Sequence, residues 1–315
     1  MKIIAVVVAY NRRELLAGTL DALAAQERPA DAVLVVDNAS SDGSGALAQA
    51  HPVVTEVLSL PRNTGGAGGF SAGIAHALMT LGAGALWLMD DDTAPTPTAL
   101  AELERAVAAY PGKVAAASSR VVWTDGRVHP MNRQRSRLFA SRGRWAKARQ
   151  VGAVPIRTGS FVSLLVDGHV AWRHRLPRAD YFIWNDDLEY SARLLRRNDG
   201  LLVPSSVVVH RTASFAGVLD APGERFFYEV RNKIWTFFFS PAFGPVERWA
   251  YVLYTAAGWV GAIRRAPDRR ALRRALARGL RAGVTKRPRS SAEVLSGLGQ
   301  VSAEVTAIDT RTSWL

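Results

Sequence analysis

Cysteine is absent from the 315-residue sequence, which excludes disulfide bonds and thiolate metal sites and fits a reducing compartment. A secretory signal peptide is not expected, because the apolar part of residues 1–10 is short and runs into polar Asn11 without a small-residue cleavage site. The uncharged segment from Trp249 to Ile263 is fifteen residues long, whereas a membrane-spanning helix needs about 20 apolar residues. These absences favour a globular domain whose first residues form a buried strand.

Acidic residues are scarce relative to basic ones. The chain has 40 Lys and Arg against 27 Asp and Glu, a formal net charge of +13. Between Arg264 and Arg289, eleven basic residues accompany a single acid, Asp268. Such a segment attracts polyanions, either nucleic acid or anionic lipid. A nucleic-acid-binding protein would explain the charge, but the basic residues form no recognisable DNA- or RNA-binding module.

Strand-like and helix-like patterns alternate through the first half of the chain. The expected strands cover residues 3–8, 32–36, 53–58, 85–89 and 114–122, and the expected helices cover residues 13–25, 43–50, 69–80 and 97–109. This order predicts an α/β fold with a doubly wound, mostly parallel sheet. Polar residues follow each of the first four strands, so they should meet at one edge of the sheet and form a nucleotide-sized crevice.

Three consecutive carboxylates, Asp90, Asp91 and Asp92, follow the apolar run from Leu86 to Met89. Adjacent carboxylates repel one another unless a cation compensates their charge. Alternate residues of an extended chain point the same way, so Asp90 and Asp92 can converge on one ion while Asp91 faces elsewhere. Such oxygen ligands suit Mg²⁺ or Mn²⁺. Taken alone, the motif is equally compatible with an acidic turn in which Asp92 caps the next helix.

Asp37 ends the second expected strand and precedes the turn-rich residues 38–44. A carboxylate at this position can accept hydrogen bonds from a base or a ribose, as in dinucleotide-binding folds. An Asx turn or a helix cap explains it as well, and the motif by itself favours that structural role.

Four glycines, Gly65, Gly66, Gly68 and Gly69, follow Asn63 at the opening of an expected helix. Glycine lets backbone N–H groups approach a ligand closely, and a helix N-terminus favours an anion. The spacing matches neither the dinucleotide fingerprint nor the P-loop. A flexible hinge is the alternative, but the position between two acidic strand ends favours a ligand-binding loop.

An aromatic-rich segment, residues 181–184, leads to Asp186 and Asp187 at the start of another helix. A carboxylate beside an apolar wall suits a general base, although either residue could instead cap the helix. Farther along, His210 ends an expected strand over 207–209, which follows another over 201–203. A lone histidine there is more often structural, but a neutral imidazole could complete the coordination begun by the aspartates.

Taken in order, these motifs resemble the family 2 glycosyltransferases with the GT-A fold. The segments that carry the resemblance are 6–11, 35–44, 63–70, 90–92, 184–190 and His210. Segments 63–70, 90–92 and 184–190 are most similar to actinobacterial galactofuranosyltransferases of cell-wall galactan synthesis, and they are also close to bacterial rhamnosyltransferases. The family implies a Rossmann-like, mostly parallel sheet flanked by helices.

The resemblance also implies a domain organisation. Residues 1–235 would form the catalytic domain, with a nucleotide-sugar half over 1–122 and an acceptor half over 123–235. Residues 236–315 would form a helical, basic C-terminal appendage that associates with membranes.

Each matching residue acquires an implied role. Donor binding would fall to Tyr10, Asp37, Asn63, Gly65, Gly66, Asp90 and Arg231; acceptor binding to Trp184, Asp186 and Glu189; and binding of the divalent metal, Mn²⁺ or Mg²⁺, to Asp92 and His210. Asp187 would be the general base that deprotonates the acceptor hydroxyl. Asp91 has no assigned role.

The implied reaction is an inverting, metal-dependent transfer of galactofuranose from UDP-galactofuranose to a polyprenyl-diphosphate-linked or other cell-envelope glycan. dTDP-rhamnose is the alternative donor. One carboxylate base without a second enzymic nucleophile implies a single displacement, and a cation would stabilise the departing diphosphate.

The uncharged segment 249–263, with its basic edge, favours an interfacial helix on an anionic membrane surface. This interpretation predicts a cytoplasmic enzyme, peripheral at the inner face of the plasma membrane. A helix packed on the core, or an oligomer interface, remains the alternative for this segment.

Residues 123–154 are rich in arginine, including Arg135 and Arg137, amid turn residues. They favour a mobile acceptor-site loop over a solvated insertion. A nucleotidyltransferase would share the sheet and the metal, but it should carry a glycine-rich triphosphate loop where this chain has Ala9-Tyr10-Asn11-Arg12. No specific nucleic-acid partner is expected.

Overall fold

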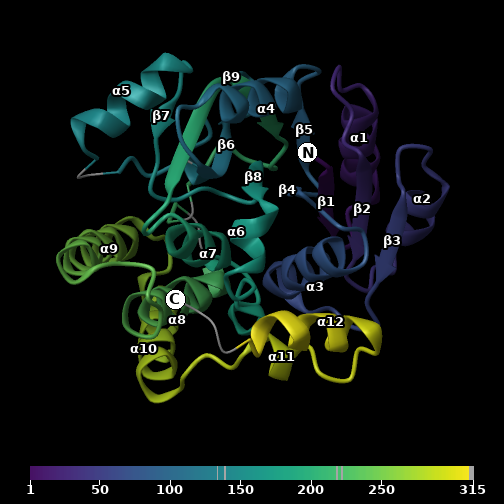
Figure 1. Cartoon of the computed structure of the whole chain (residues 1–315). Coiled ribbons are helices and arrows are strands. Elements are labelled where there is room, and N and C mark those ends of the chain that lie inside the picture. Colours follow the sequence, from purple (N-terminus) through teal and green to yellow (C-terminus); the bar gives the residue numbers. More distant parts are fainter. Residues whose placement is uncertain (133, 138–139, 218, 221–222, 312–315) are drawn as a thin grey trace.

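Figure 1 presents the computed structural model of the chain, which describes residues 1–132, 134–137, 140–217, 219–220 and 223–311. One sheet forms its centre, with strands in the order β3-β2-β1-β4-β8-β6-β9-β5 and β7 also paired to β9. The strands are β1 (Ile3–Ala9), β2 (Ala32–Asp37), β3 (Glu56–Ser59), β4 (Ala85–Asp90), β5 (Thr93–Pro95), β6 (Val114–Val122), β7 (Val154–Pro155), β8 (Leu164–Asp167) and β9 (Asp199–His210). Six of the described strands run in one direction, whereas β5, β7 and β8 run against it; the six are β1, β2, β3, β4, β6 and β9. The predicted mostly parallel α/β sheet is therefore confirmed.

Helices cover both faces of this sheet (Figure 1). They are α1 (Arg13–Ala24), α2 (Ser44–Ala50), α3 (Gly65–Met79), α4 (Ala99–Ala109), α5 (Arg142–Gln150), α6 (Gly168–Trp172), α7 (Asp186–Leu194), α8 (Phe226–Phe238), α9 (Pro245–Arg265), α10 (Arg269–Thr285), α11 (Ser291–Val294) and α12 (Gln300–Asp309). Three predictions about individual elements were wrong. β3 begins at Glu56 and not at residue 53, α3 begins at Gly65 and not at residue 69, and the two strands expected over 201–209 are one strand, β9.

The alternation of side chains along β1 divides the core into two layers. Ile4, Val6 and Val8 pack on the side of α3, where Phe70 and Ile74 contribute. The intervening residues of β1 pack on the opposite side with α1 and α4. All residues of β1 are buried, as expected for a central strand covered on both faces.

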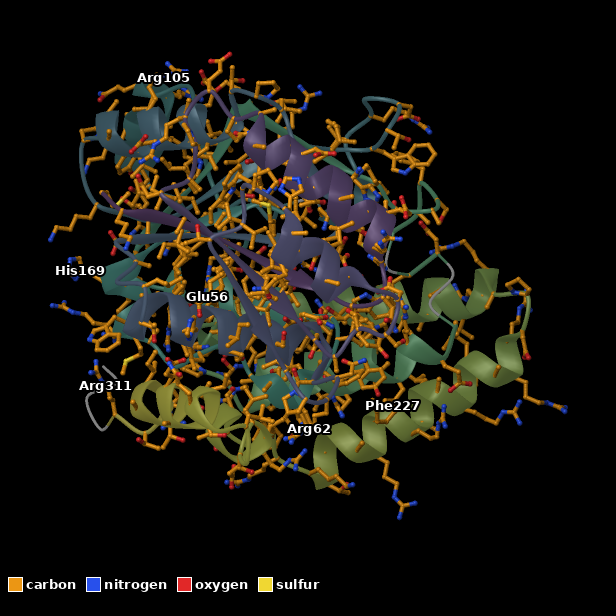
Figure 2. The ribbon with its side chains drawn as sticks, turned by 90° about the vertical axis from the view of Figure 1, so that its right-hand side faces the viewer. Glu56, Arg62, Arg105, His169, Phe227 and Arg311 are labelled. Atoms are coloured by element: carbon orange, nitrogen blue, oxygen red, sulfur yellow. The ribbon has the colours of Figure 1, made fainter. Side chains whose placement is uncertain are left out.

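The C-terminal region is helical, as predicted, but it is not detached from the sheet domain. The predicted boundary at residue 235 lies inside α8. Val301 and Val305 of α12 belong to the same core as α3. Arg62, labelled in Figure 2, donates a hydrogen bond of 2.9 Å to the carbonyl of Val294. Residues 294–305 therefore pack against residues 62–79 of the sheet domain.

Helices α8, α9 and α10 form a satellite cluster at one corner of the molecule (Figure 1). Gly279 and Gly283 let α10 lie directly against α8, since a Cβ atom at these positions would come within 2.7 Å of Val230 and 2.8 Å of Ile234, respectively. Within the described part of the chain, no helix has both the length and the apolar character that a bilayer crossing requires.

Candidate active site

The carboxyl ends of β1, β2 and β4 lie level at one edge of the sheet. Ala9 pairs with Asp37 across β1 and β2, and Val8 pairs with Asp90 across β1 and β4. The predicted convergence of polar strand ends is thus present, and it follows from parallel pairing of buried strands.

Asp90, Asp92 and His210 come together at this edge. One ligand atom from each lies within 4.8 Å of the others. The antiparallel pairing of β5 with β9 sets Thr93 opposite His210, and this register carries the histidine to the end of β4. The predicted trio is therefore brought together by the pairing of β9 with β5, which begins at Thr93 directly after the aspartates.

The surroundings of His210 suit metal binding. Its Nδ1 lies 2.7 Å from Oδ1 of Asn132, whose Nδ2 donates in turn to Ser160 Oγ at 3.0 Å. This orientation makes Nδ1–H the donor and leaves the Nε2 lone pair free to bind a cation. Nε2 lies 3.1 Å from Asp92 Oδ1, which is buried and has no hydrogen bond among the described residues. Such an orphaned carboxylate oxygen beside an imidazole lone pair fits a divalent ion.

Asp91 has a structural role that the sequence did not reveal. Its carboxylate accepts from the Tyr10 backbone N–H at 3.0 Å and from Arg12 Nη1 at 3.2 Å, and Arg12 also pairs with Asp92 at 2.7 Å. Burial raises the pKa of Asp91 to about 6, although Arg12 opposes the shift. Asp91 and Asp92 form a turn, as the alternative proposed, but the turn is buried and Asp92 caps no helix, because the N-cap of α4 is Thr98.

The electrostatics of the cluster favour an additional cation. Burial, followed by repulsion from Asp92 and Asp91, raises the pKa of Asp90 well above its ordinary value, and Asp186 adds to the repulsion. A divalent ion would offset this repulsion.

The residues predicted for donor binding flank the cluster. Tyr10 is 42% exposed beside it, whereas Asp37 is buried and accepts from the Ser40 backbone N–H at 3.0 Å. Asp37 thus makes the Asx-type turn that the sequence left open, and its role toward a nucleotide stays a prediction. Asn63 accepts from the Gly65 backbone N–H at 2.8 Å and so joins β3 to the start of α3.

The glycine-rich segment is the first turns of α3, and not a flexible hinge. A Cβ atom on Gly69 would lie 2.5 Å from Val8, so glycine lets the helix approach β1. Gly65 has φ of +72° and lies against the backbone of Phe182. Among these four glycines, only Gly66 has open space where a Cβ atom would lie, and it is partly exposed.

The loop before α7 has an unusual backbone. Phe182, Trp184 and Asn185 all have φ between +63° and +67°, which is unfavourable for residues with a side chain. Asn232 of α8 offsets the cost, because its Nδ2 donates to three carbonyls of this loop, including that of Trp184 at 2.8 Å. Arg231 donates to the loop as well, at 2.8 Å to the carbonyl of Asp180.

This placement changes the interpretation of Arg231. Its guanidinium is held by loop carbonyls and lies 4.3 Å from the centre of the Trp235 ring. The geometry supports a positioning role for Arg231, and its predicted donor contact stays a prediction. Trp184, at the turn into α7, is partly exposed beside the acids that follow.

Asp186 is buried and Asp187 is partly buried at the start of α7, where neither is the N-cap. Burial, with repulsion from Asp187, raises the pKa of Asp186 to about 8. Burial also raises the pKa of Asp187, while hydrogen bonds from the Leu188 N–H and from Ser160, and the charge of Lys233, lower it. Asp186 therefore favours the protonated form at neutral pH, and the role of Asp187 as the base stays a prediction.

Glu189 does not fit its predicted contact with the acceptor. Its side chain is fully buried, and its carboxylate accepts from Arg193 Nε at 2.9 Å and from Ser240 Oγ at 2.6 Å. These partners lower the pKa of Glu189 despite its burial. Glu189 forms an internal ion pair with Arg193, and its hydrogen bond from Ser240 fixes α7 to the segment after α8. Its carboxylate is therefore not available to contact an acceptor.

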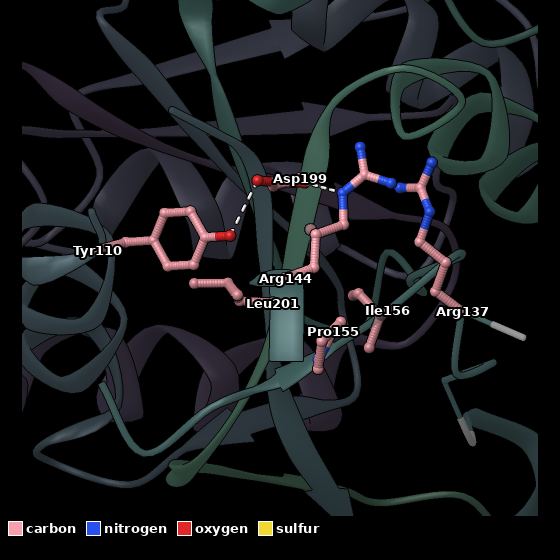
Figure 3. Close-up of a pocket in the computed structure, with 8 residues that line it drawn as sticks. Tyr110, Arg137, Arg144, Pro155, Ile156, Asp199 and Leu201 are labelled. Atoms are coloured by element: carbon pink, nitrogen blue, oxygen red, sulfur yellow. Dashed lines mark hydrogen bonds and ion pairs between the residues drawn. The ribbon is translucent and has the colours of Figure 1, made fainter. Parts of the chain in front are cut away.

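The arginine-rich residues 123–154 are not one mobile loop. They include α5, which is fastened to β9: Asp199 accepts from Arg144 Nε at 2.7 Å and from the Tyr110 hydroxyl at 2.8 Å (Figure 3). Arg137 donates to the carbonyls that end α7. The hollow that these side chains line leaves no volume for a ligand.

Three residues of the site escaped prediction. Arg12 bridges two aspartates, Asn132 orients His210, and Lys233 lies beside Asp187. Arg12 adjoins a recognised motif and could have been found. The other two depend on tertiary contacts that no local pattern announces.

Comparison with known proteins agrees with this geometry. Residues 4–167 match the model of glycosyl transferase family 2, just over half of the chain. Galactofuranosyltransferase GlfT1 of Mycolicibacterium smegmatis is 49% identical over 94 residues, 30% of this chain and 31% of that protein. GlfT1 of Mycobacterium tuberculosis is 46% identical over 95 residues, 29% of this chain and 30% of that protein. The aligned segments thus span about a third of these relatives.

Solved structures share the fold. The mannosyltransferase PcManGT from Pyrobaculum calidifontis, in complex with GDP-Man and Mn²⁺, has a TM-score of 0.56 at 17% identity and covers 99% of this chain and 87% of that chain. TarS 1–349 of S. aureus, in complex with UDP, has a TM-score of 0.55 at 14% identity and covers 90% and 89%. The fold is therefore GT-A, and the chain is an enzyme that belongs to glycosyl transferase family 2.

Proposed function

We propose that the chain is an inverting, metal-dependent transferase that moves galactofuranose from UDP-galactofuranose to a cell-envelope glycan. The observation that carries this proposal is the meeting of two acidic groups at one sheet edge. Asp90, Asp92 and His210 stand on the nucleotide side, and Asp186 of the second group is close enough to raise the pKa of Asp90.

Asp92 and His210, with Asp90, would hold Mn²⁺ or Mg²⁺, which supplies positive charge to the leaving diphosphate when bound. Asn132 orients the imidazole, and Arg12 holds Asp91 and Asp92 at their positions. Mn²⁺ in the PcManGT complex supports a divalent ion in this fold.

Asp187 is the general base of the proposed reaction. Its carboxylate takes the proton of the acceptor hydroxyl while that oxygen bonds to the anomeric carbon. The bond from this carbon to the diphosphate oxygen breaks, and its electron pair leaves with the nucleotide. Because no second enzymic nucleophile is required, the configuration at the anomeric carbon inverts.

The choice of donor rests on similarity to the GlfT1 galactofuranosyltransferases, and the UDP complex of TarS supports a uridine nucleotide. Asp37, Asn63 and Gly66 would contact its base, ribose or phosphates at the edge of the sheet. dTDP-rhamnose is the second candidate donor.

A membrane surface is the proposed location of the acceptor. One face of α9 exposes a stripe of apolar side chains, hereafter the α9 stripe, formed by Val246, Trp249, Leu253 and Val260. Leu253 is 69% exposed. The neighbouring α10 exposes arginines along its length. An apolar stripe beside a cationic helix fits a peripheral position at the cytoplasmic face of the plasma membrane, on a polyprenyl-diphosphate-linked acceptor.

Ligand-induced shifts of the melting temperature test the donor first. UDP with Mn²⁺ should raise the Tm more than dTDP or GDP. Turnover with UDP-galactofuranose should then exceed turnover with dTDP-rhamnose. A preference for dTDP and for dTDP-rhamnose would replace the donor assignment, and no stabilisation by any nucleotide would contradict the proposal.

A further inference from the structure

A cavity of about 210 Å³ lies between α8, α9 and the segment before α5. Its walls include Arg135, Glu229 and Lys233, together with Tyr254 and Thr255 of α9. The chemistry of the proposed reaction does not use this cavity. Its polar lining therefore calls for another occupant.

The cavity contains more positive than negative charge. Lys233 is 5% exposed, and among the described residues no carboxylate lies within ion-pair distance of its Nζ or of the Arg135 guanidinium. Burial lowers the pKa of Lys233 to about 8; Glu229 and Asp187 oppose this shift, and Arg135 adds to it, so the two cations affect one another. A buried cation without a close partner is costly, and an anion in the cavity would remove that cost.

Glu229 does not neutralise both cations. Its Oε2 accepts from Asn185 Nδ2 at 2.7 Å, and its Oε1 lies 3.4 Å from Nε1 of Trp259. Both carboxylate oxygens are thus directed to other groups. Arg135 instead lies over two rings of α9, 4.8 Å from the centre of Tyr251 and 5.2 Å from that of Tyr254. The residues that line the cavity thus include two cations, Arg135 and Lys233, and one carboxylate, Glu229.

The position of the cavity indicates which class of anion would bind there. On one side Lys233 acts on Asp187, the proposed base, and Asn185 links Glu229 to the start of α7. On the other side Tyr254 is 68% exposed and adjoins Leu253 of the α9 stripe. A ligand that reached from Asp187 through the cavity to Tyr254 would pass Lys233 and Arg135, which line the same cavity. In a carrier-linked glycan, the phosphate groups stand between the sugar and the apolar chain in that same order.

We propose that this cavity is the subsite for the phosphate groups that join the acceptor glycan to its lipid carrier, bound by Lys233 and Arg135. The inference rests on the proposed function, and it names the part of the acceptor that the active site recognises besides the reacting hydroxyl. Tyr254 and the α9 stripe would then guide the first part of the apolar chain.

A binding experiment tests the subsite without any transfer reaction. Farnesyl diphosphate is titrated into the full chain in EDTA by calorimetry, against farnesol and inorganic pyrophosphate. The wild type should bind farnesyl diphosphate at least tenfold more tightly than either of the other two. Lys233→Met and Arg135→Gln should each reduce that affinity at least tenfold, Lys233→Arg should restore most of it, and Arg105→Gln should leave it unchanged. Arg105 is the matched control, because it lies on α4 far from α8 (Figure 2).

Other outcomes of the titration overturn the inference. Equal binding of pyrophosphate would assign the cavity to a free anion. Loss of binding to vesicles of anionic phospholipid in Lys233→Met would assign it to a bilayer headgroup. Unchanged affinity in both cavity variants, with their melting temperatures near that of the wild type, would leave it without a phosphate.

A kinetic experiment separates the subsite from the transferase proposal. With a diphosphate-linked acceptor, Lys233→Met should raise KM at least tenfold, and with the same glycan on a neutral alkyl group KM should change less than twofold. An equal rise for both acceptors would contradict the subsite while leaving the transferase intact. Failure of the wild type to transfer any sugar, with farnesyl diphosphate binding retained, would contradict the proposed function alone.

Discussion

Residues 1–122 and residues 123–235, the proposed nucleotide-sugar and acceptor halves, build their parts of the candidate site in different ways. In the first half, Asp37 and Asp90 follow buried parallel strands, and the strand register alone brings them level. In the second half, the acids of α7 are held by a strained loop that Asn232 of α8 supports through three hydrogen bonds. Acids at strand ends can therefore be recognised from local sequence, whereas the contacts between packed segments that hold the acids of α7 cannot.

The largest effect should come from the acceptor half. Asp187→Asn removes the proposed base, so kcat should fall about a thousandfold, within the range for general base catalysis. The shift in Tm caused by UDP and Mn²⁺ should persist, because the substitution leaves the nucleotide side intact. Turnover of Asp21→Asn, an acid on the exposed side of α1, serves as the control, and a kcat for Asp187→Asn within threefold of the control would remove Asp187 from the mechanism.

The second-largest effect should come from Asn132, which lies in the poorly predicted residues 123–154 and contacts His210. Asn132→Ala removes the acceptor of the His210 Nδ1–H and should weaken Mn²⁺ binding by about 10- to 100-fold, since outer partners orient metal ligands. Calorimetric titration of Mn²⁺ measures the change. Gln134→Ala, two residues along with its amide bonded to Ser118, should bind Mn²⁺ like the wild type. Equal affinity in the two variants would show that His210 needs no such support.

A smaller effect concerns stability. The folded chain retains a proton on Asp186, whose pKa is about 8, while the unfolded chain releases it near pH 4, so this residue makes stability fall as the pH rises from about 4 to 8. Asp186→Asn removes that dependence and should stabilise the chain at pH 7 by roughly 1–4 kcal/mol, with no gain below pH 4. Denaturation in EDTA at a series of pH values measures it. A constant difference across that range would refute the raised pKa.

The smallest effect concerns the α9 stripe. Leu253→Asp should reduce binding to anionic vesicles about five- to tenfold, because only part of the side chain enters the interface. Met79→Asp, at the end of α3, is a matched change of an exposed apolar residue. If both variants bind vesicles as the wild type does, the stripe is not a membrane surface.

The sequence predicted much of the first half because its signals are local. Strands β1, β2 and β4, and the acids Asp37 and Asp90 at their ends, all follow from short apolar runs that end in polar residues. The antiparallel insertion of β8 between β4 and β6 could not be predicted, since β8 pairs with β4 across more than 70 residues and with β6 across 46 to 50.

Other parts were misread for physical reasons. Glu189 has the same carboxylate as its neighbours in sequence, and only tertiary packing shows that Arg193 and Ser240 occupy it. Asn132 and Lys233 carry no sequence signal, because their roles are defined by the groups that lie next to them in the fold. The glycines of α3 predicted a close approach to a ligand, whereas the structure shows Gly69 against β1 and Gly65 against the loop at Phe182, so contact with a ligand stays a prediction.

The central claim is that Asp187 activates the acceptor for one displacement at the anomeric carbon, opposite the departing nucleotide. Proton NMR of the first product formed from UDP-galactofuranose measures the anomeric configuration directly. The account predicts a product with the configuration opposite to that of the donor from the earliest time point. Retention of the donor configuration would contradict it, because retention requires a second displacement or attack from the same face.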